Sequence, residues 1–520
     1  MTCGPLALRR HHDAHYITTT LPYVNGRPHI GHALEFVEAD VLARHRRARG
    51  DQVRLQAGTD DNSLNNVLAA QAAGQDVQEY VDQNARLLVS LIPALSLSVD
   101  DVIRTSTDPR HQPGVTALWR ACAADLYRKH YEGWYCTGCE QFYTPGEVCV
   151  EHPNTPLEHV EEENWFFRLS GYGDRLRDAI SSGRLRIEPA GRRNEVLALI
   201  ESGLDDFSVS RPAARAKGWG IPVPDDPGQV IYVWFDALAN YVTALGYGSA
   251  GSAEAEASDY GRWWAGDGRR LHVLGKGVLR FHAVYWPAML LAAGLPLPTD
   301  LFVHDYLTAG GAKVSKSAQH GDVLGPATLA AEYGTDALRW WLLREVPRVG
   351  DTDFTPERLI ARADNELANG IGNLVNRVVA MIHRYRGGLL PGPAASPVAG
   401  TDELVHTCRT APDRVDEALA GFSFKSASGA VWQIAHQANG YINQVKPWTL
   451  AGDPGPAASL DTVLGTLYQA CQVLAAELAP FLPDAAERIA AQLTPVSPGG
   501  PLPRPVPVFQ RLRVQPGWTR

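Results

Sequence analysis

The chain has 520 residues, enough for about three or four domains, and its 45% of hydrophobic residues excludes wholesale disorder. Its formal net charge of -9 excludes indiscriminate coating of nucleic acid, but a local basic track for RNA is compatible with it. No apolar run reaches the roughly 18 residues of a membrane span, and the N-terminal segment lacks the apolar core of a secretion signal. Seven cysteines, three of them crowded beside one histidine, indicate reduced thiols and a metal site in a cytoplasmic protein.

The N-terminal part of the chain alternates between strand and helix patterns. A β-rich run over 15–26 ends in turn residues, and helical periodicity then continues to Gly50. Segment 51–61 reads as a short strand that ends in a polar loop, and 65–74 reads as another helix. This order predicts an open, mostly parallel α/β sheet that binds ligands at the carboxyl ends of its strands.

Three changes in residue composition and hydrophobic pattern divide the rest of the chain. Tyr, Cys, Glu and Trp dominate after about Ala121, as in an inserted domain. Apolar strand-like runs, each leading into a helix or loop, resume at 229–238, 271–290 and 300–307. After about Asp353 the pattern is helical, which predicts a bundle, and a Pro-rich tail is expected to lie loosely on its surface. We therefore expect the two halves of an α/β domain at 1–120 and 191–310, an insertion at 121–190, a loop region at 311–352 and a helical domain at 353–520.

The first chemical motif is PHIGH, which stands at the head of the first predicted helix. Gly31 lets a flat ligand lie against the backbone, and the helix N-terminus offers N–H groups to phosphate oxygens. His29 and His32 can add donors to the same phosphates. Taken alone, an ordinary helical turn with incidental histidines explains this motif equally well.

The second motif is KVSKS, on a loop after the strand-like run 300–307. Lys313 and Lys316 are two of only seven lysines in the chain, and their ammonium groups repel each other unless an anion sits between them. A polyphosphate is such an anion, and the loop can close over it as charge shifts in a transition state. The alternative is a solvated basic turn.

The pair of motifs resembles the HIGH and KMSKS signatures of class I aminoacyl-tRNA synthetases, and further segments resemble methionyl-tRNA synthetases from Tyr16 to about Pro483. The resemblance implies a Rossmann-type parallel-sheet catalytic domain split by a connective insertion and followed by an all-α anticodon-binding domain. It implies ATP and Mg²⁺ as cofactors, with methionine and tRNA(Met) as substrates. The residues it assigns to ATP are His29, Gly31, His32, Gly275, Lys313, Ser315 and Lys316.

The same resemblance assigns an amino-acid pocket. An apolar, aromatic slot suits a flexible thioether, and a carboxylate at its mouth suits an ammonium group. Asp60 would hold the substrate ammonium, and Arg211, in FSVSRP, matches an arginine associated with activation. The remaining pocket positions are Leu21, Tyr23, Trp234, Ala237, Tyr241, Val278 and His282. Without the two signatures, ordinary core packing would explain these aromatic residues.

The cysteine cluster lies within the expected insertion, where the family often carries a zinc knuckle. A CxxC at Cys136 and Cys139 and a CxxH at Cys149 and His152 have the spacing of a tetrahedral Cys3His zinc site. Four protein ligands would leave no open position, so the zinc would be structural. Two unrelated pairs are the alternative, and Glu151 or solvent can take the place of His152.

The helical region carries a third set of resemblance-based assignments. Asn373 and Arg377 are four residues apart and share a helix face, and Trp448 follows in KPW. The family uses an Asn, an Arg and a Trp in these contexts to recognise the anticodon, since single-stranded bases stack on aromatic rings. The alternative for Trp448 is a core residue at a helix end.

Several positions depart from the family pattern. They are Asn62 and Ser63 in GTDDNS where GTDEHG is common, Gly277 where GKD is usual, Asp305 where Gly is usual, and Gln319 and His320 as extra residues after KVSKS. A lost hydrogen-bonding carboxylate at position 277 costs about 1.5–3 kcal/mol, or roughly 10- to 100-fold in rate. These departures keep two rivals open: a paralogue that activates methionine or a related amino acid for biosynthesis, and a non-catalytic tRNA-binding protein. Since no OB-type domain follows the helical region, we expect a monomer.

Overall fold

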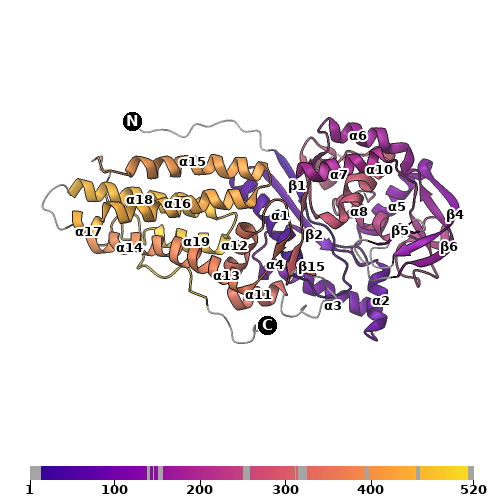
Figure 1. The fold of residues 1–520 in the computed structure, drawn as a ribbon, viewed down its shortest axis with the longest axis horizontal. Helices are drawn as coiled ribbons and strands as arrows, with labels where there is room; N and C mark the ends of the chain where they lie inside the picture. Colours follow the sequence, from indigo (N-terminus) through magenta and orange to yellow (C-terminus); the bar gives the residue numbers. More distant parts are fainter. Residues whose placement is uncertain are drawn as a thin grey trace. The chain divides into compact units, whose positions relative to one another are not determined.

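A computed structural model describes residues 13–136, 141–143, 146–149, 156–249, 258–310, 312–313, 325–392, 397–451 and 457–512. The chain forms two compact units (Figure 1). The first unit comprises Met1–Pro28, His45–Ser90 and Ser98–His304, and the second comprises His29–Arg44, Leu91–Leu97 and Asp305–Arg520. No helix in the described part of the chain is long and apolar enough to cross a membrane.

A six-stranded, all-parallel sheet organises the first unit. Its order is β3-β2-β1-β12-β13-β7. The strands are β1 (Ala14–Thr18), β2 (Gln52–Thr59), β3 (Asp101–Arg104), β7 (Arg186–Glu188), β12 (Arg269–Gly275) and β13 (Asp300–His304). The chain leaves β1 toward β2 on one side, while β12 pairs with its other side, so the strand order reverses between β1 and β12. Ligands of such sheets bind at the carboxyl ends of the strands beside this reversal.

Chain segments between β3 and β12 form two smaller antiparallel sheets. The first has the order β5-β4-β6-β8 and is built on a long hairpin of β4 (Leu126–Cys136) and β6 (Glu158–Phe167), with β5 (Gln141–Tyr143) and β8 (Phe207–Ser208) at its edges. The second contains β9 (Ser210–Pro212), β10 (Pro222–Val223) and β11 (Asp226–Ile231). The predicted insertion therefore contains a β-hairpin, called the insertion hairpin below.

Helices complete the first unit. They are α2 (Leu64–Ala72), α3 (Val77–Val89), α5 (His111–Ala121), α6 (Gly173–Ser181), α7 (Ala190–Glu201), α8 (Val233–Thr243) and α10 (Trp286–Ala292). Helices α5 and α8 approach so closely that a Cβ on Gly114 would lie 2.4 Å from a methyl group of Thr243. The buried core joins aromatic rings of the sheet and of these helices, among them Tyr16, Phe235 and Trp286.

The second unit is mainly helical and is drawn in orange to yellow over most of its length (Figure 1). Its helices are α4 (Leu91–Ala94), α11 (Pro326–Tyr333), α12 (Thr335–Glu345), α13 (Pro356–Arg362), α14 (Asn373–Arg386), α15 (Thr401–Ala420), α16 (Phe424–Val445), α17 (Pro447–Leu450), α18 (Ala457–Leu478) and α19 (Pro483–Leu493). Most of α1 (Ile30–Ala48) belongs to this unit as well. Helices α15, α16 and α18 pack on one another, and α14 packs on α18.

A small sheet and a buried ion pair complete this unit. The sheet has the order β15-β14-β16, with β14 (Leu307–Ala309), β15 (Ala312–Lys313) and β16 (Thr352–Asp353). Arg339 of α12 and Asp40 of α1 form an ion pair at 2.8 Å with both side chains fully buried. Arg339 also donates to the backbone oxygens of Leu95, Pro480 and Phe481 at 2.9, 3.2 and 2.8 Å.

The expectation of a loosely lying tail is wrong for the described residues up to Leu512. The Leu502 amide donates to the Gly388 oxygen at 2.8 Å, and the Val506 amide donates to the Gln492 side chain at 3.0 Å. Leu502 is 2% exposed. Proline removes backbone donors, but the tail's remaining amides and its carbonyls still find partners on the helices.

Candidate active site

The loops after β1 and β2 bring the first pocket residues together in the first unit. Tyr23 pairs with Asp60 in an isolated parallel bridge, and the Asp60 amide donates to the Pro22 oxygen at 3.0 Å. Asp60 is 2% exposed, so its carboxylate lies inside the protein at the end of the sheet. A Cβ on Gly58 would lie 2.3 Å from the backbone oxygen of Ile103 and 2.8 Å from Leu21, so glycine is needed for β2 to pack this closely on β3 and Leu21.

Helix α8 supplies residues to an aromatic cluster, which is called the aromatic slot below after the slot expected from the sequence. Trp234, Ala237 and Tyr241 are three and four residues apart and therefore lie on the same helix face. Trp234 stacks on Phe281 with ring centres 3.6 Å apart and planes 5° apart, and it lies 6.3 Å from the ring of Tyr23. The indole N–H of Trp234 is buried and has no hydrogen-bond acceptor within the described part of the chain. Sequence reasoning missed Phe281, although it directly precedes a predicted pocket residue.

Tyr241, His282 and Val278 form a connected chain at the other side of this slot. The Tyr241 hydroxyl lies 2.7 Å from Nε2 of His282, and Nδ1 of His282 lies 2.9 Å from the Val278 oxygen. A carbonyl oxygen only accepts, so Nδ1 of His282 carries the proton in this contact. In the neutral ring Nε2 is then an acceptor, and the Tyr241 hydroxyl donates to it.

A second histidine, which sequence reasoning missed, lies against Tyr241. The His272 ring stacks on the Tyr241 ring at 3.9 Å. Burial, the nearby His282 and then Arg270 hold the pKa of His272 well below its usual value, so the ring is neutral. The Trp286 indole donates to its Nε2 at 3.3 Å, which leaves Nδ1–H to donate to the Thr18 hydroxyl at 2.7 Å. The hydrogen-bonded His272 ring therefore holds the Tyr241 ring in place by stacking on it.

A polar network lies next to Asp60 in the chain. The side-chain amide of Asn62 donates to the Asp236 carboxylate of α8 at 2.7 Å. Nε2 of His111 contacts the other carboxylate oxygen of Asp236 at 2.5 Å. The departure at position 62 thus ties the loop after β2 to the helix of the aromatic slot. Burial raises the pKa of the neighbouring Asp61 carboxyl, although the Arg104 guanidinium opposes this effect. No sequence motif pointed to these contacts.

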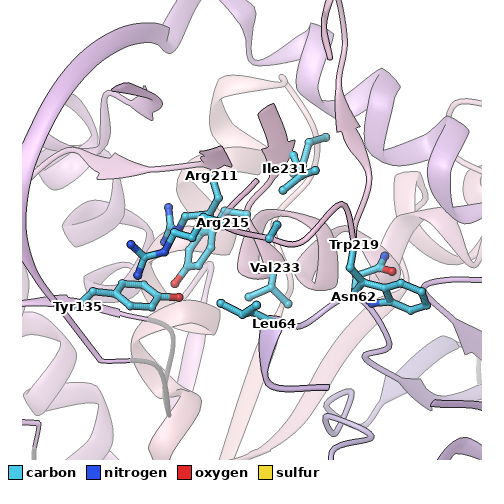
Figure 2. Close-up of a pocket in the computed structure, with 11 residues that line it drawn as sticks. Asn62, Leu64, Tyr135, Arg211, Arg215, Trp219, Ile231 and Val233 are labelled. Atoms are coloured by element: carbon cyan, nitrogen blue, oxygen red, sulfur yellow. The ribbon is translucent and has the colours of Figure 1, made fainter. Parts of the chain in front are cut away.

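Arg211 lies in a pocket of the first unit (Figure 2). It is 7% exposed and donates to the Ser208 hydroxyl at 2.9 Å and the Ser210 oxygen at 2.7 Å. Its Cζ lies 4.2 Å from the ring centre of Tyr232 and 5.4 Å from that of Tyr135. Asn62, Arg215 and Trp219 also line the pocket, and none of its lining residues within the described ranges is a carboxylate.

Gly275 ends β12 beside the reversal of strand order. A Cβ there would lie 3.3 Å from the His304 ring, so a side chain would crowd the end of β13. A short 3-10 turn, Lys276–Val278, follows, and its middle residue is Gly277. The turn that joins β12 to the pocket residue Val278 therefore carries no carboxylate.

The PHIGH motif lies at the start of α1, as predicted. The His29 and His32 rings stack at 3.8 Å, and the Gly31 amide donates to Nδ1 of His29 at 3.1 Å. The His29 amide donates to Nδ1 of His32 at 3.0 Å. A Cβ on Gly31 would meet the His29 ring at 3.0 Å, so glycine permits this tight turn.

Only the start of the KVSKS motif lies within the described residues. Lys313 is in β15 and pairs with Thr308 of β14. Ser315 and Lys316 lie outside the described residues, as do the predicted extra residues Gln319 and His320.

Two of the four predicted zinc ligands are described. Cys136 ends β4, and both Cys136 and Cys149 are buried. The Tyr143 hydroxyl contacts the Cys149 sulfur at 3.2 Å. Cys139 and His152 lie outside the described residues. Within the described ranges no group of three or more His, Cys, Asp or Glu side chains could hold a metal ion.

The predicted anticodon residues lie on two helices of the second unit. Asn373 and Arg377 are on α14, and the Arg377 guanidinium donates to Asn439 and Asn443 of α16 at 3.5 and 3.3 Å. Burial lowers the pKa of Arg377. Trp448 is on α17 and is 48% exposed, which argues against the core position that was its alternative. Sequence reasoning missed Asn439 and Asn443.

Comparisons with known proteins identify the family. The model of the family "tRNA synthetases class I (M)" matches residues 15–161 and 148–379. The methionine–tRNA ligase of Caldanaerobacter subterraneus subsp. tengcongensis is 39% identical over 484 residues, which cover 92% of this chain and 73% of the relative. That of Brucella suis biovar 1 is 38% identical over 529 residues, covering 96% of this chain and 98% of the relative. The structure of Mycobacterium tuberculosis methionyl-tRNA synthetase in complex with methionyl-adenylate matches with a TM-score of 0.88 at 34% identity, covering 96% of this chain and 100% of that chain. The chain therefore belongs to the methionine–tRNA ligases, ATP-dependent ligases of the class I aminoacyl-tRNA synthetases.

Proposed function

We propose that this chain activates methionine with ATP to methionyl-adenylate and transfers the methionyl group to the 3′ end of tRNA(Met). The aromatic slot beside Asp60 is the observation that carries the proposal. Trp234 brings a buried indole N–H to this slot that has no acceptor within the described residues, which is an incomplete arrangement in the absence of a ligand.

The slot suits methionine by shape and polarity. A flexible, polarisable thioether packs well against rings such as Trp234 and Tyr241. In this proposal Asp60 binds the substrate ammonium. The other contacts come from Leu21, Tyr23, Ala237, Val278 and His282. Because an apolar slot discriminates weakly between side chains of similar size, the fixed hydroxyl of Tyr241 contributes to selectivity.

Phosphate binding is assigned to the two signature motifs. The Nδ1 atoms of His29 and His32 accept from backbone amides, so each ring carries its proton on Nε2 and donates from it to phosphate oxygens, while Gly31 keeps the backbone accessible. Lys313, Ser315 and Lys316 hold the leaving pyrophosphate, and Gly275 lets the nucleotide lie against the end of β12. Mg²⁺ bound with ATP supplies further neutralisation of phosphate charge.

The reaction needs no protein nucleophile. The substrate carboxylate attacks the α-phosphorus, the bond to the bridging oxygen breaks, and pyrophosphate leaves. The 3′-terminal ribose hydroxyl of tRNA then attacks the carbonyl carbon of the adenylate, and AMP leaves. Positioning and electrostatic stabilisation carry the catalysis, and Arg211 contributes a fixed positive charge.

We further propose a structural zinc site on the insertion hairpin. Cys136 and Cys149 fit a metal because both are buried, and the contact of the Cys149 sulfur with the Tyr143 hydroxyl resembles the outer hydrogen bonds that orient metal ligands. Cys139 and His152 would complete a Cys3His set. Zinc there would fix the tip of the hairpin.

Recognition of tRNA is assigned to the helical region. An exposed Trp448 offers a ring on which an unpaired base can stack. Arg377, oriented by the two asparagines of α16, and Asn373 offer hydrogen bonds to base edges. The boundaries predicted at 120, 190, 310 and 352, a cytoplasmic location and a monomeric state belong to the same proposal, and size-exclusion chromatography with light scattering tests the last.

The decisive experiment is ATP–pyrophosphate exchange with each standard amino acid in the absence of tRNA, followed by charging of tRNA(Met). Exchange with methionine alone and methionylated tRNA are expected. Exchange with another amino acid would favour the biosynthetic paralogue, which the departures at Gly277, Asn62 and Asp305 motivate. Folded protein with no exchange at all would favour a non-catalytic tRNA-binding protein.

A further inference from the structure

We propose that Tyr135, on the insertion hairpin, is a positioning residue for Arg211 in methionine activation. The inference rests on the proposed role of Arg211 and deepens it. In this inference the insertion hairpin orients a side chain of the activation site.

Two aromatic rings and two serine residues contact the Arg211 guanidinium. Tyr232, directly before α8, lies 4.2 Å from its Cζ, and Tyr135, next to the last residue of β4, lies 5.4 Å from it. Ser208 and Ser210 accept hydrogen bonds along one edge. Figure 2 shows Arg211 beside Tyr135 in the pocket. Tyr135 is 1% exposed, so water screens this contact little.

The Tyr135 ring is itself held in place. Arg215 lies over it with Cζ 4.5 Å from the ring centre and donates to Glu162 of β6 at 2.7 Å. Two cations beside one ring would repel each other, but Glu162 neutralises the charge of Arg215. Arg215 therefore braces the ring, and the ring in turn orients Arg211.

The backbone that carries Arg211 is tied to the same hairpin. The Trp165 amide of β6 donates to the Ser210 hydroxyl at 2.8 Å, and that hydroxyl donates to Gln229 at 2.6 Å. The side-chain amide of Gln229 donates to the backbone oxygen of Glu163 at 2.9 Å. A change in the hairpin is thus transmitted to Arg211 both through its backbone and through the ring of Tyr135.

An aromatic face suits this task because it orients a cation without cancelling its charge. A carboxylate at the position of Tyr135 would hold the guanidinium as firmly but would weaken its attraction for phosphate or carboxylate oxygens. The arrangement favours a residue that acts electrostatically in the transition state.

The test compares Tyr135→Leu with Tyr135→Phe in methionine-dependent pyrophosphate exchange. Tyr135→Leu should lower kcat about 10- to 30-fold, with the KM for methionine changed less than about twofold. Tyr135→Phe keeps the ring face and should retain wild-type kcat. Trp134→Leu is the matched control, since Trp134 is the neighbouring aromatic residue of the same strand and packs on His159.

A double variant separates positioning from folding. In an Arg211→Gln background, Tyr135→Leu should lower kcat no further, whereas a general folding defect would lower it again. If Tyr135→Leu does not fold, a fluorinated phenylalanine at position 135 keeps the volume, weakens the ring's attraction for cations, and should still lower kcat. Unchanged kcat in Tyr135→Leu or in the protein with fluorinated phenylalanine at position 135 would overturn the inference. Additive losses in the double variant would overturn it as well. Wild-type protein without methionine-dependent exchange would instead refute the proposed function.

Discussion

Removing the charge of Asp40 tests how strongly the buried ion pair stabilises the second unit. Asp40→Asn keeps the shape of the side chain and leaves the Arg339 guanidinium fully buried without a counterion, and it also removes the carboxylate that pairs at 2.9 Å with the partly exposed Arg44. Loss of one partner of a buried pair costs about 3–5 kcal/mol. Three backbone oxygens still accept from Arg339, which places the expected loss near the lower end, about 3 kcal/mol.

Calorimetry measures this loss directly. About 2–4 °C of melting temperature corresponds to 1 kcal/mol for a unit of 150–250 residues, so the transition of the second unit should fall by about 6–12 °C. Hydrogen exchange of α12 assigns the transition to this unit. Arg358→Gln is the control, because Arg358 contacts Glu345 at 3.3 Å with its side chain 45% exposed, and should cost at most about 1 kcal/mol.

Replacing both Asp40 and Arg339 separates the cost of an uncompensated charge from the cost of an altered side-chain shape. Asp40→Leu combined with Arg339→Met removes both charges and should recover most of the stability that Asp40→Asn loses. An Asp40→Asn protein that melts no lower than Arg358→Gln would refute the view that the uncompensated charge dominates.

Three other outcomes are expected. Trp448→Ala should raise the KM for tRNA by about 5- to 160-fold, from the roughly 1–3 kcal/mol of one base stack, and should leave tRNA-independent pyrophosphate exchange unchanged; an unchanged KM would remove Trp448 from the anticodon site. Because His272 has a folded-state pKa well below its unfolded value near 6.5, the unfolded chain binds more protons, so unfolding free energy should decrease as pH falls below about 6.5, by up to about 1.4 kcal/mol per unit. Urea melts at several pH values measure this slope, which should be shallower in a folded His272→Gln variant. Cys149→Ser should lower the zinc content of purified protein measured by mass spectrometry, and an unchanged content would exclude Cys149 as a ligand.

Local patterns were enough to predict several parts of the fold and site. The strand before PHIGH and the helix that starts within it are confirmed, because turn residues and helical periodicity act over short stretches. The common face of Trp234, Ala237 and Tyr241 was not predicted, because the run 229–238 indicates a strand that leads into a helix or loop and does not show that the helix begins at Val233. The family resemblance supplied the roles of these residues, which periodicity cannot give.

Contacts between distant segments could not be predicted. No local pattern indicates that Phe281 stacks on Trp234 or that His272 stacks on Tyr241. The pair of Asp40 and Arg339 has no local signature either, since each reads as an ordinary helical charge. These partners are selected by three-dimensional packing, which depends on the whole fold.

The bonded tail limits how far this chain can be shortened. Leu502 and Val508 are buried, and the tail carbonyl of Pro503 accepts from the His383 ring of α14. Deletion after Gly500 would uncover this apolar strip next to the helix that carries Arg377. The proline-rich segment up to Leu512 supports α14, so trimming into this segment should loosen the proposed anticodon-reading surface.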